Sequence, residues 1–149
     1  MTYVSNKKAG LNFELLEEFE AGISLLGTET KSIRNKRGKL ESAHVIIRGG
    51  EAFLVGASIP AFQKANAPDD YDPERPRKLL LKAKELAVLY NASEQKGLTI
   101  VPLQLYNSGR KLKLKLAIAR GKKKFDKRES IKAKDTKRDL DRELKRSFT

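Results

Sequence analysis

Apolar and polar positions alternate in two long segments of the chain, residues 11–27 and 110–120. A period of two residues is typical of a β-strand with one buried face. The first segment therefore predicts one long, bent strand, although the Glu-rich stretch ELLEEFEAG within it also has good helix propensity. In the second segment leucines alternate with Lys111, Lys113 and Lys115. These lysines lie either on a solvated face or on a face that meets RNA.

Two β-hairpins are predicted from their turn residues. In residues 43–59 two apolar runs flank Gly49–Gly50, and glycines readily adopt the positive φ that a tight two-residue turn requires. Residues 98–106 and 110–120 flank a three-residue loop that ends in glycine, Asn107-Ser108-Gly109. Pro102 has no amide hydrogen, so its strand is expected to have an edge or a bulge there.

The remaining segments predict two helices and a loop. Residues 28–39 are expected to form a short helix that Thr28 caps and Gly38 ends. Residues 60–78 hold four of the five prolines and are expected to form a long exposed loop. A second helix is predicted over residues 77–97, with Gly97 at its end and one apolar side formed by Leu79, Leu86, Leu89 and Tyr90.

These elements predict a mainly β fold with flanking helices, arranged as a small closed or nearly closed barrel. The expected organisation is a globular domain over residues 1–120 and a polar tail over residues 121–149. A domain of this size buries an adequate core without disulfides.

The charge of the chain points to a class of partner. The sequence has 32 Lys and Arg and 19 Asp and Glu, which gives a net charge of +13. Such an excess favours a polyanionic partner, either nucleic acid or an anionic membrane surface. Residues 119–149 contain 13 Lys and Arg and 6 Asp and Glu, so this fifth of the chain carries +7. The membrane alternative is disfavoured, since the charged tail has no Trp and few apolar anchors.

Several classes of chemistry lack their usual residues. The chain has no cysteine and one histidine, His44, which is expected to be structural or exposed. We find no metal-ligand spacing, no glycine-rich phosphate loop and no nucleophile–base motif, so neither an enzyme nor a cofactor is expected. The sequence contains no run of about 18 apolar residues, so no membrane span is predicted. No secretory signal is recognised at the N-terminus, and a cytoplasmic location is expected.

The tail has too few apolar residues to form a core of its own. Its last three large apolar residues, Leu140, Leu144 and Phe148, make only a thin helical stripe. Such a stripe offsets little of the ordering cost of about 1–2 kcal/mol per backbone residue. The tail is therefore predicted to be disordered when free and helical on a partner. The alternative is a solvated tail that only increases solubility.

The first part of the tail, GKKKFDKR at 121–128, has chemistry suited to RNA. Gly121 offers a pivot, and the closely spaced cations that follow it suit neighbouring phosphates. Phe125 lies among them, and an aromatic ring within a basic run can stack on a base.

Five segments, taken together, resemble the tmRNA-binding small protein B family of bacterial trans-translation. They occur in the family's order, and the resemblance covers roughly residues 6–146. The segments are NKKA (6–9), EEFEAGISLLGTETKSIR (17–34), GEAFLVGASI (50–59), RPRKLLLKAKEL (75–86) and ARGKKKFDKRESIK (119–132).

The resemblance implies an oligonucleotide-binding-type (OB-like) barrel and a non-enzymatic adaptor, bound to RNA as a monomer. Such a protein binds the tRNA-like part of tmRNA and enters ribosomes stalled on mRNA without a stop codon. Its tail reaches the decoding centre and lies as a helix in the empty mRNA channel. Elongation factor Tu and alanyl-tRNA synthetase are implied as indirect partners, through tmRNA.

The resemblance also implies site residues at matching positions. Lys82 replaces a frequent Asn or His, which leaves phosphate contact open but puts base recognition in doubt, and Thr136 replaces a Trp of some relatives. The implied tmRNA-binding residues are Asn6, Lys7, Glu20, Lys31, Arg34, Arg75, Arg77, Lys78, Leu80 and Lys82. The implied residues for the decoding centre and mRNA channel are Gly121, Lys122, Lys123, Lys124, Phe125, Asp126, Lys127 and Arg128.

Other interpretations of these residues remain. A structural or assembly component of the ribosome would also combine a barrel with a basic tail, but it would remain on purified subunits. An RNA-modifying enzyme or nuclease is a second rival. Without the resemblance, Glu20 is an ordinary strand carboxylate, and Leu80 on a helix is more often a core residue than a contact.

Overall fold

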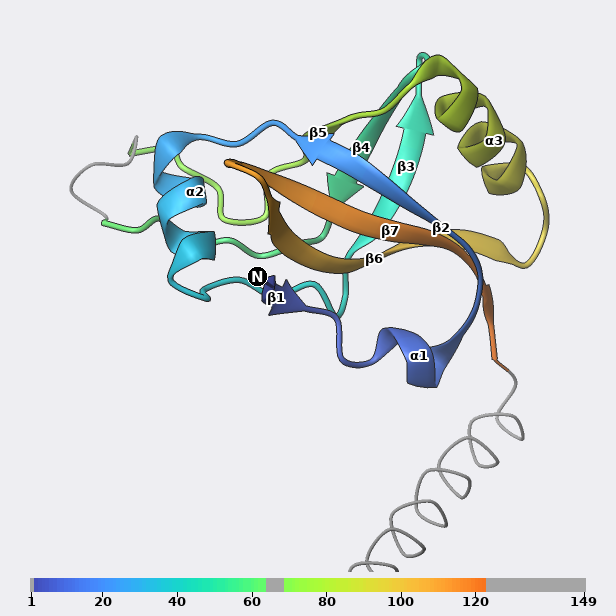
Figure 1. Cartoon of the computed structure of the whole chain (residues 1–149), viewed down its shortest axis with the longest axis horizontal. Coiled ribbons are helices and arrows are strands. Elements are labelled where there is room, and N and C mark those ends of the chain that lie inside the picture. Colours follow the sequence, from blue (N-terminus) through green and yellow to red (C-terminus); the bar gives the residue numbers. More distant parts are fainter. Residues whose placement is uncertain (1, 64–68, 123–149) are drawn as a thin grey trace, which may run out of the picture.

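The computed structural model describes residues 2–63 and 69–122, which form a curved antiparallel sheet with three short helices (Figure 1). The strands are β1 Thr2–Ser5, β2 Phe13–Ile23, β3 His44–Arg48, β4 Glu51–Val55, β5 Arg77–Leu80, β6 Leu98–Ser108 and β7 Lys111–Gly121. The helices are α1 Ala9–Asn12, α2 Gly27–Arg34 and α3 Ala83–Ser93. The predicted mainly β fold with flanking helices is confirmed.

The seven strands are hydrogen-bonded in the order β1-β6-β7-β2-β5-β4-β3. The sheet curls until β3 packs near β6, but no hydrogen-bonded ladder joins its two edge strands within the described residues. The barrel predicted from the sequence is therefore an open one. Figure 1 shows α2 beyond one end of the curved sheet and α3 at the other.

The inner face of β7 contributes much of the core. Leu114 and Leu116 are completely buried, and Ile118 is nearly so. They pack in one cluster with residues of β4, β6 and α3, among them Leu54, Leu105 and Leu89. The alternation predicted for residues 110–120 is thus confirmed, with the lysines on the opposite face.

The two hairpin turns lie at the predicted glycines, but one of them differs in length from the prediction. Gly49 and Gly50, with φ of 58° and 75°, join β3 to β4 as predicted. The β6–β7 turn is shorter than predicted, because Ser108 pairs with Lys111 and leaves only two residues between the strands. A register shift follows Pro102, which confirms the predicted bulge.

The segment 11–27 is not one uninterrupted strand. Its first two residues belong to α1, and β2 carries a register shift between Leu15 and Glu17. The predicted alternation of buried and exposed positions therefore changes sides at this point. Leu15 is 37% exposed, while Ala21 is completely buried. The competing helical interpretation of ELLEEFEAG is wrong, because β2 pairs with β7 along nearly its whole length.

The predicted helix at 77–97 begins later than expected. Residues 77–80 form β5, which fills the gap between β2 and β4, and the helix spans Ala83–Ser93. Leu79 is therefore buried in the sheet, whereas Tyr90 of α3 is 49% exposed. Local propensity was overridden here by pairing on both sides of a short strand.

The first predicted helix is also shorter than expected, since α2 ends at Arg34, well before Gly38. Thr28 does not cap it, and its hydroxyl instead accepts a hydrogen bond from the Phe62 amide at 2.8 Å. The cap comes from within the helix, where Glu29 accepts a hydrogen bond from the Leu26 amide at 2.8 Å. Strand β1, which the sequence did not predict, pairs with β6.

Candidate RNA-binding groove

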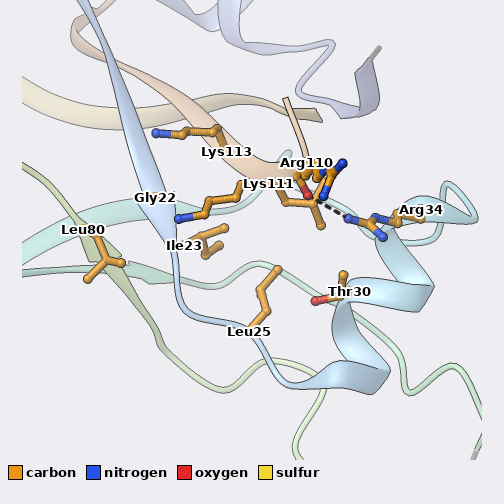
Figure 2. Close-up of a pocket in the computed structure, with 10 residues that line it drawn as sticks. Gly22, Ile23, Leu25, Thr30, Arg34, Leu80, Arg110, Lys111 and Lys113 are labelled. Carbon is orange, nitrogen blue, oxygen red and sulfur yellow. Dashed lines mark hydrogen bonds between the residues drawn. The ribbon is translucent and has the colours of Figure 1, made fainter. Parts of the chain in front are cut away.

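A hollow of about 400 Å³ lies where α2, the ends of β2 and β5, and the β6–β7 turn meet (Figure 2). Strands β2, β5 and β7 are neighbours in the sheet, so segments distant in sequence contribute to one surface. We call this hollow the groove. It is lined by Gly22, Ile23, Leu25, Thr30, Arg34, Leu80, Arg110, Lys111, Leu112 and Lys113.

The cations of the groove come from two elements. Arg34 ends α2, and one of its guanidinium nitrogens donates a hydrogen bond to the carbonyl oxygen of Arg110 at 3.3 Å (Figure 2). Lys111 follows directly at the start of β7. In the described part of the chain no carboxylate lies within ion-pair distance of these three cations. Unneutralised positive charge in a hollow attracts a polyanion.

Leu80 provides the apolar side of the groove. It is 58% exposed although it belongs to a paired strand, because its partner across the ladder is Gly22. A Cβ atom added at Gly22 would lie only 3.2 Å from the Cβ of Leu80. The glycine thus leaves Leu80 the room that it occupies, and an exposed leucine among cations suits contact with a nucleotide.

Glu20 lies beside the groove as part of a row across three strands. The Tyr106 hydroxyl of β6 donates a hydrogen bond to its carboxylate, and Lys113 of β7 forms an ion pair with it at 3.6 Å. Partial burial and the neighbouring carboxylate raise the pKa of Tyr106 to about 12. Glu20 nevertheless remains half-exposed and is oriented to accept a hydrogen bond from a ribose or base.

Further ion pairs cross the same strands. Lys115 reaches Glu18 at 3.5 Å, and Arg120 reaches Glu14 at 4.0 Å. Such exposed pairs contribute only about 0–1 kcal/mol each. The three alternating lysines of β7 therefore have different surroundings. Lys111 and Lys113 line the groove, whereas Lys115 is neutralised on a solvated face.

Besides Arg34, four implied tmRNA-binding cations are exposed. Lys31 lies one turn before Arg34 on α2, and Lys82 immediately precedes α3. Lys78 lies two residues before Leu80 and pairs with Glu51 at 3.0 Å, while Lys7 is exposed after β1. Of the ten implied residues, the structure brings Arg34 and Leu80 into the groove and Glu20 to its border.

Asn6 takes a structural position. Its backbone amide donates to the Leu103 carbonyl at 2.7 Å, and its side-chain amide donates to the Pro102 carbonyl at 2.9 Å. These bonds fasten the end of β1 to the bulge of β6. The side-chain oxygen of Asn6 is buried without a hydrogen-bond partner.

Arg77, one of the residues expected to bind phosphate, is buried in the structure. Its side chain is 0% exposed, and it donates to Glu29 at 2.6 and 2.9 Å and to the carbonyls of Ala57 and Pro73 at 2.8 Å each. Every part of the guanidinium is thus used inside the protein. The side chain of Arg75 is 31% exposed and binds the same carboxylate.

Glu29 is the centre of this buried network. Burial by itself raises the pKa of the Glu29 carboxyl, but the hydrogen bonds from Arg75, the Leu26 amide and Arg77 outweigh burial and hold the pKa below its usual value. The Tyr71 hydroxyl also contacts Glu29, at 3.2 Å. The network joins α2 to β5 and to the loop that precedes β5, and so fixes two walls of the groove.

Gly121 and Lys122, the first two residues of the implied tail site, belong to the globular part of the structure. Gly121 still belongs to β7 and lies opposite Phe13. The backbone amide of Lys122 donates to Asn12 at 2.9 Å, and its ammonium donates to the Gly10 carbonyl at 3.0 Å. The other implied channel residues, 123–128, lie outside the described part of the chain, as do Thr136 and the apolar stripe at 140–148.

Three groove residues, Arg110, Lys111 and Lys113, were absent from the implied tmRNA-binding set. The sequence feature that could have identified them is the β6–β7 hairpin, because its turn brings the cationic face of β7 toward α2. The exact turn length was needed to place Arg110 at its tip.

His44 is exposed at the start of β3. No group of three or more potential metal ligands occurs within residues 2–63 and 69–122. Among these residues no helix has the length and apolar character needed to span a membrane.

Comparisons with known proteins agree over most of the chain. The family model described as SmpB protein matches residues 3–146. An SsrA-binding protein of Syntrophobacter fumaroxidans is 49% identical over 141 residues, which cover 95% of this chain and 87% of the relative. An SsrA-binding protein of Gloeobacter violaceus is 48% identical over 143 residues, covering 96% and 93%.

A solved structure is also similar. It is described as "tmRNA-SmpB: a journey to the center of the bacterial ribosome", and the matching chain is 41% identical with a TM-score of 0.68. The match covers 80% of this chain and 84% of that one.

Proposed function

Because the chain belongs to the SmpB protein family, we propose that it is a non-enzymatic adaptor that binds the tRNA-like domain of tmRNA and delivers it to stalled ribosomes. The observation that carries the tmRNA-binding step is the groove, which is lined by an exposed leucine and by three cations that have no carboxylate partner among the described residues. The cations attract phosphates, and Leu80 contacts a ribose or base that the phosphates bring close.

Glu20 and Lys113 extend this surface. The ion pair between them is exposed and weak, so an RNA phosphate can replace the carboxylate as the partner of Lys113. Glu20 is then free to accept a hydrogen bond from a sugar hydroxyl or a base. Its bond from Tyr106 keeps the carboxylate in place while its partner changes.

The tail, in this proposal, acts on the ribosome and not on tmRNA. Residues 121–128 enter the decoding centre, and the following residues form a helix in the empty mRNA channel. Peptidyl transfer remains ribosomal chemistry. Elongation factor Tu and alanyl-tRNA synthetase act on the tmRNA that the protein holds, and the site of action is the cytoplasm.

Gel-shift titration at two salt concentrations, with bulk tRNA as competitor, tests the division between groove and tail. The truncated chain should end after Lys122, because its contacts to Gly10 and Asn12 complete the globular domain. We expect 1–122 to bind tmRNA like the full chain and to lose peptide tagging. If truncation abolishes tmRNA binding, or if the truncated chain tags at the normal rate, the division is wrong.

Substitutions test the groove itself. Arg34→Ala and Arg110→Ala should each weaken tmRNA binding and reduce its salt dependence by about one unit of log–log slope. Lys96→Ala is the matched control, since Lys96 lies in the turn that follows α3. Figure 1 shows α3 at the opposite end of the sheet from α2. Equal loss in all three variants would indicate a general effect of net charge and contradict a specific groove.

Occupancy of purified ribosomal subunits separates this function from that of a ribosomal structural protein. A rescue adaptor should join ribosomes only when tmRNA is present and the mRNA channel is empty. Stable retention on subunits without tmRNA would favour the structural component.

A further inference from the structure

Helix α2 ends in a tight turn of the backbone that is not part of the groove. The amide of Lys36 donates to the carbonyl of Ile33 at 2.8 Å, and the amide of Arg37 donates to the carbonyl of Ser32 at 2.9 Å. These two bonds form a Schellman motif, which requires a left-handed residue directly after the helix cap. That residue is Lys36, with φ of 61°.

A lysine is unfavourable at this position. The left-handed conformation brings the Cβ of an L-residue close to its own carbonyl region, so glycine is usual in this motif. Lys36 is the one non-glycine residue with positive φ among residues 2–63 and 69–122. A residue that breaks a local backbone rule without evident structural gain suggests a function for its side chain.

The side chains around this reversal are cationic and without ion-pair partners. Lys36, Arg37 and Lys39 are all exposed, and in the described part of the chain no carboxylate lies within 4.0 Å of their charged groups. Some cations of the sheet differ, since Lys78 and Lys115 have such partners. We call Lys36, Arg37 and Lys39 the basic cap.

The backbone and one ring hold the basic cap in place. Lys39 exchanges backbone hydrogen bonds with Ser58, at 2.9 and 3.1 Å. The guanidinium carbon of Arg37 lies 5.8 Å from the centroid of the Phe62 ring, a cation–π distance. Three cations are therefore displayed from a fixed turn, which lowers the entropy that they lose on binding an anion.

The basic cap continues the groove around the end of α2. Arg34 is the link, because it lines the groove and lies two residues before Lys36. Arg34 also bonds to Arg110, so the cations of the groove and of the cap are connected at the end of α2. Closely spaced cations along a strip match the repeating phosphates of an RNA backbone.

We propose that the basic cap is a second RNA-phosphate site, and that Lys36 is kept in a left-handed conformation because its ammonium contacts a phosphate there. The inference rests on the proposed function for the identity of the RNA, which is tmRNA or ribosomal RNA. Both offer the same phosphate chemistry, and the experiment separates them.

Substitution at Lys36 separates charge from backbone structure. Lys36→Gly removes the ammonium and relieves the backbone, so the variant should melt at a higher temperature than the wild type. Lys36→Asn removes the charge with a residue that tolerates the left-handed region, and Lys36→Arg keeps the charge. A merely structural role for Lys36 predicts that RNA affinity does not fall when stability rises.

Full-length variants are measured first with tmRNA alone and then with tmRNA on stalled ribosomes. We expect Lys36→Gly and Lys36→Asn to bind more weakly, with a log–log salt slope reduced by about one, while Lys36→Arg binds normally. Weaker binding with tmRNA alone assigns the phosphate to tmRNA, and weaker binding only on the ribosome assigns it to ribosomal RNA.

Normal affinity and normal salt slope in both assays would overturn the inference, as would an equal loss in the remote control Lys96→Asn. These results leave the proposed function intact as long as wild-type protein binds tmRNA. Failure of the wild type to bind tmRNA would instead remove the proposed function.

Discussion

Replacing Arg77 by methionine tests whether the buried network around Glu29 holds the fold together. Methionine keeps most of the length and apolar stem of arginine but removes the charge and every donor. The variant removes the Arg77 hydrogen bonds to the carbonyls of Ala57 and Pro73, of which Pro73 still accepts from the Ile59 amide. It leaves Glu29 with Arg75 as its remaining cation among the described residues.

The expected cost follows from burial. Removing one partner of a buried ion pair typically costs about 3–5 kcal/mol, because the other charge stays buried without compensation. Arg77 and Glu29 are both 0% exposed, so the upper part of this range applies to their pair. Arg75 remains on the same carboxylate and reduces the loss, so we expect about 3 kcal/mol.

Urea unfolding of full-length protein, followed by far-ultraviolet circular dichroism, measures this cost. With an m-value of about 2 kcal/mol per molar urea, the midpoint should fall by about 1.5 M. Lys78→Met is a matched control one residue away in β5. The ion pair of Lys78 with Glu51 has both side chains nearly half-exposed, so this loss should stay below about 1 kcal/mol.

Equal midpoints for Arg77→Met and Lys78→Met would refute the argument. Such a result would mean that Arg77 is accessible to solvent in the folded protein, and its phosphate-binding role would return. A large loss of stability in Arg77→Met, with the control unaffected, supports the structural role.

Three further predictions concern single side chains. Gly22→Ala should displace Leu80, cost about 1–3 kcal/mol by overpacking and weaken tmRNA binding; normal gel-shift affinity would contradict the contact. Tyr106 should ionise near pH 12 in an absorbance titration, and Tyr106→Phe should remove that step. Because the folded-state pKa of Glu29 is lowered, its carboxylate stabilises the fold fully above pH 4.5, and this contribution is lost as the pH falls through the folded-state pKa. Unfolding experiments should show a smaller acid-dependent loss in Glu29→Gln; an unchanged pH profile would exclude this role.

Strands β4 and β7 could be predicted because their sequences carry local information. The alternation of Leu114 and Leu116 with lysines identifies a half-buried strand, and Gly49–Gly50 specifies the turn of a hairpin. Both features depend on neighbours in sequence, so the tertiary structure added only the partners.

Strand β5 could not be predicted, because the information that makes it a strand is not local. Residues 77–80 lie directly before a helical sequence and have apolar residues that also suit a helix. Their conformation is decided by β2 and β4, which pair with them from both sides. The same pairing turns Leu80 outward over Gly22 and turns Arg77 inward toward Glu29.

The sequence by itself determined the mainly β class, the hairpins, the excess of positive charge and, through its motifs, the resemblance to one family. Only the tertiary structure decided which cations are available to RNA. Arg77 and Arg110 belong to the same residue type, yet Arg77 is paired with a buried carboxylate, whereas Arg110 lies at a turn and has no carboxylate partner among the described residues. Charge is a property of composition, but its availability depends on desolvation and on neighbours brought together by folding.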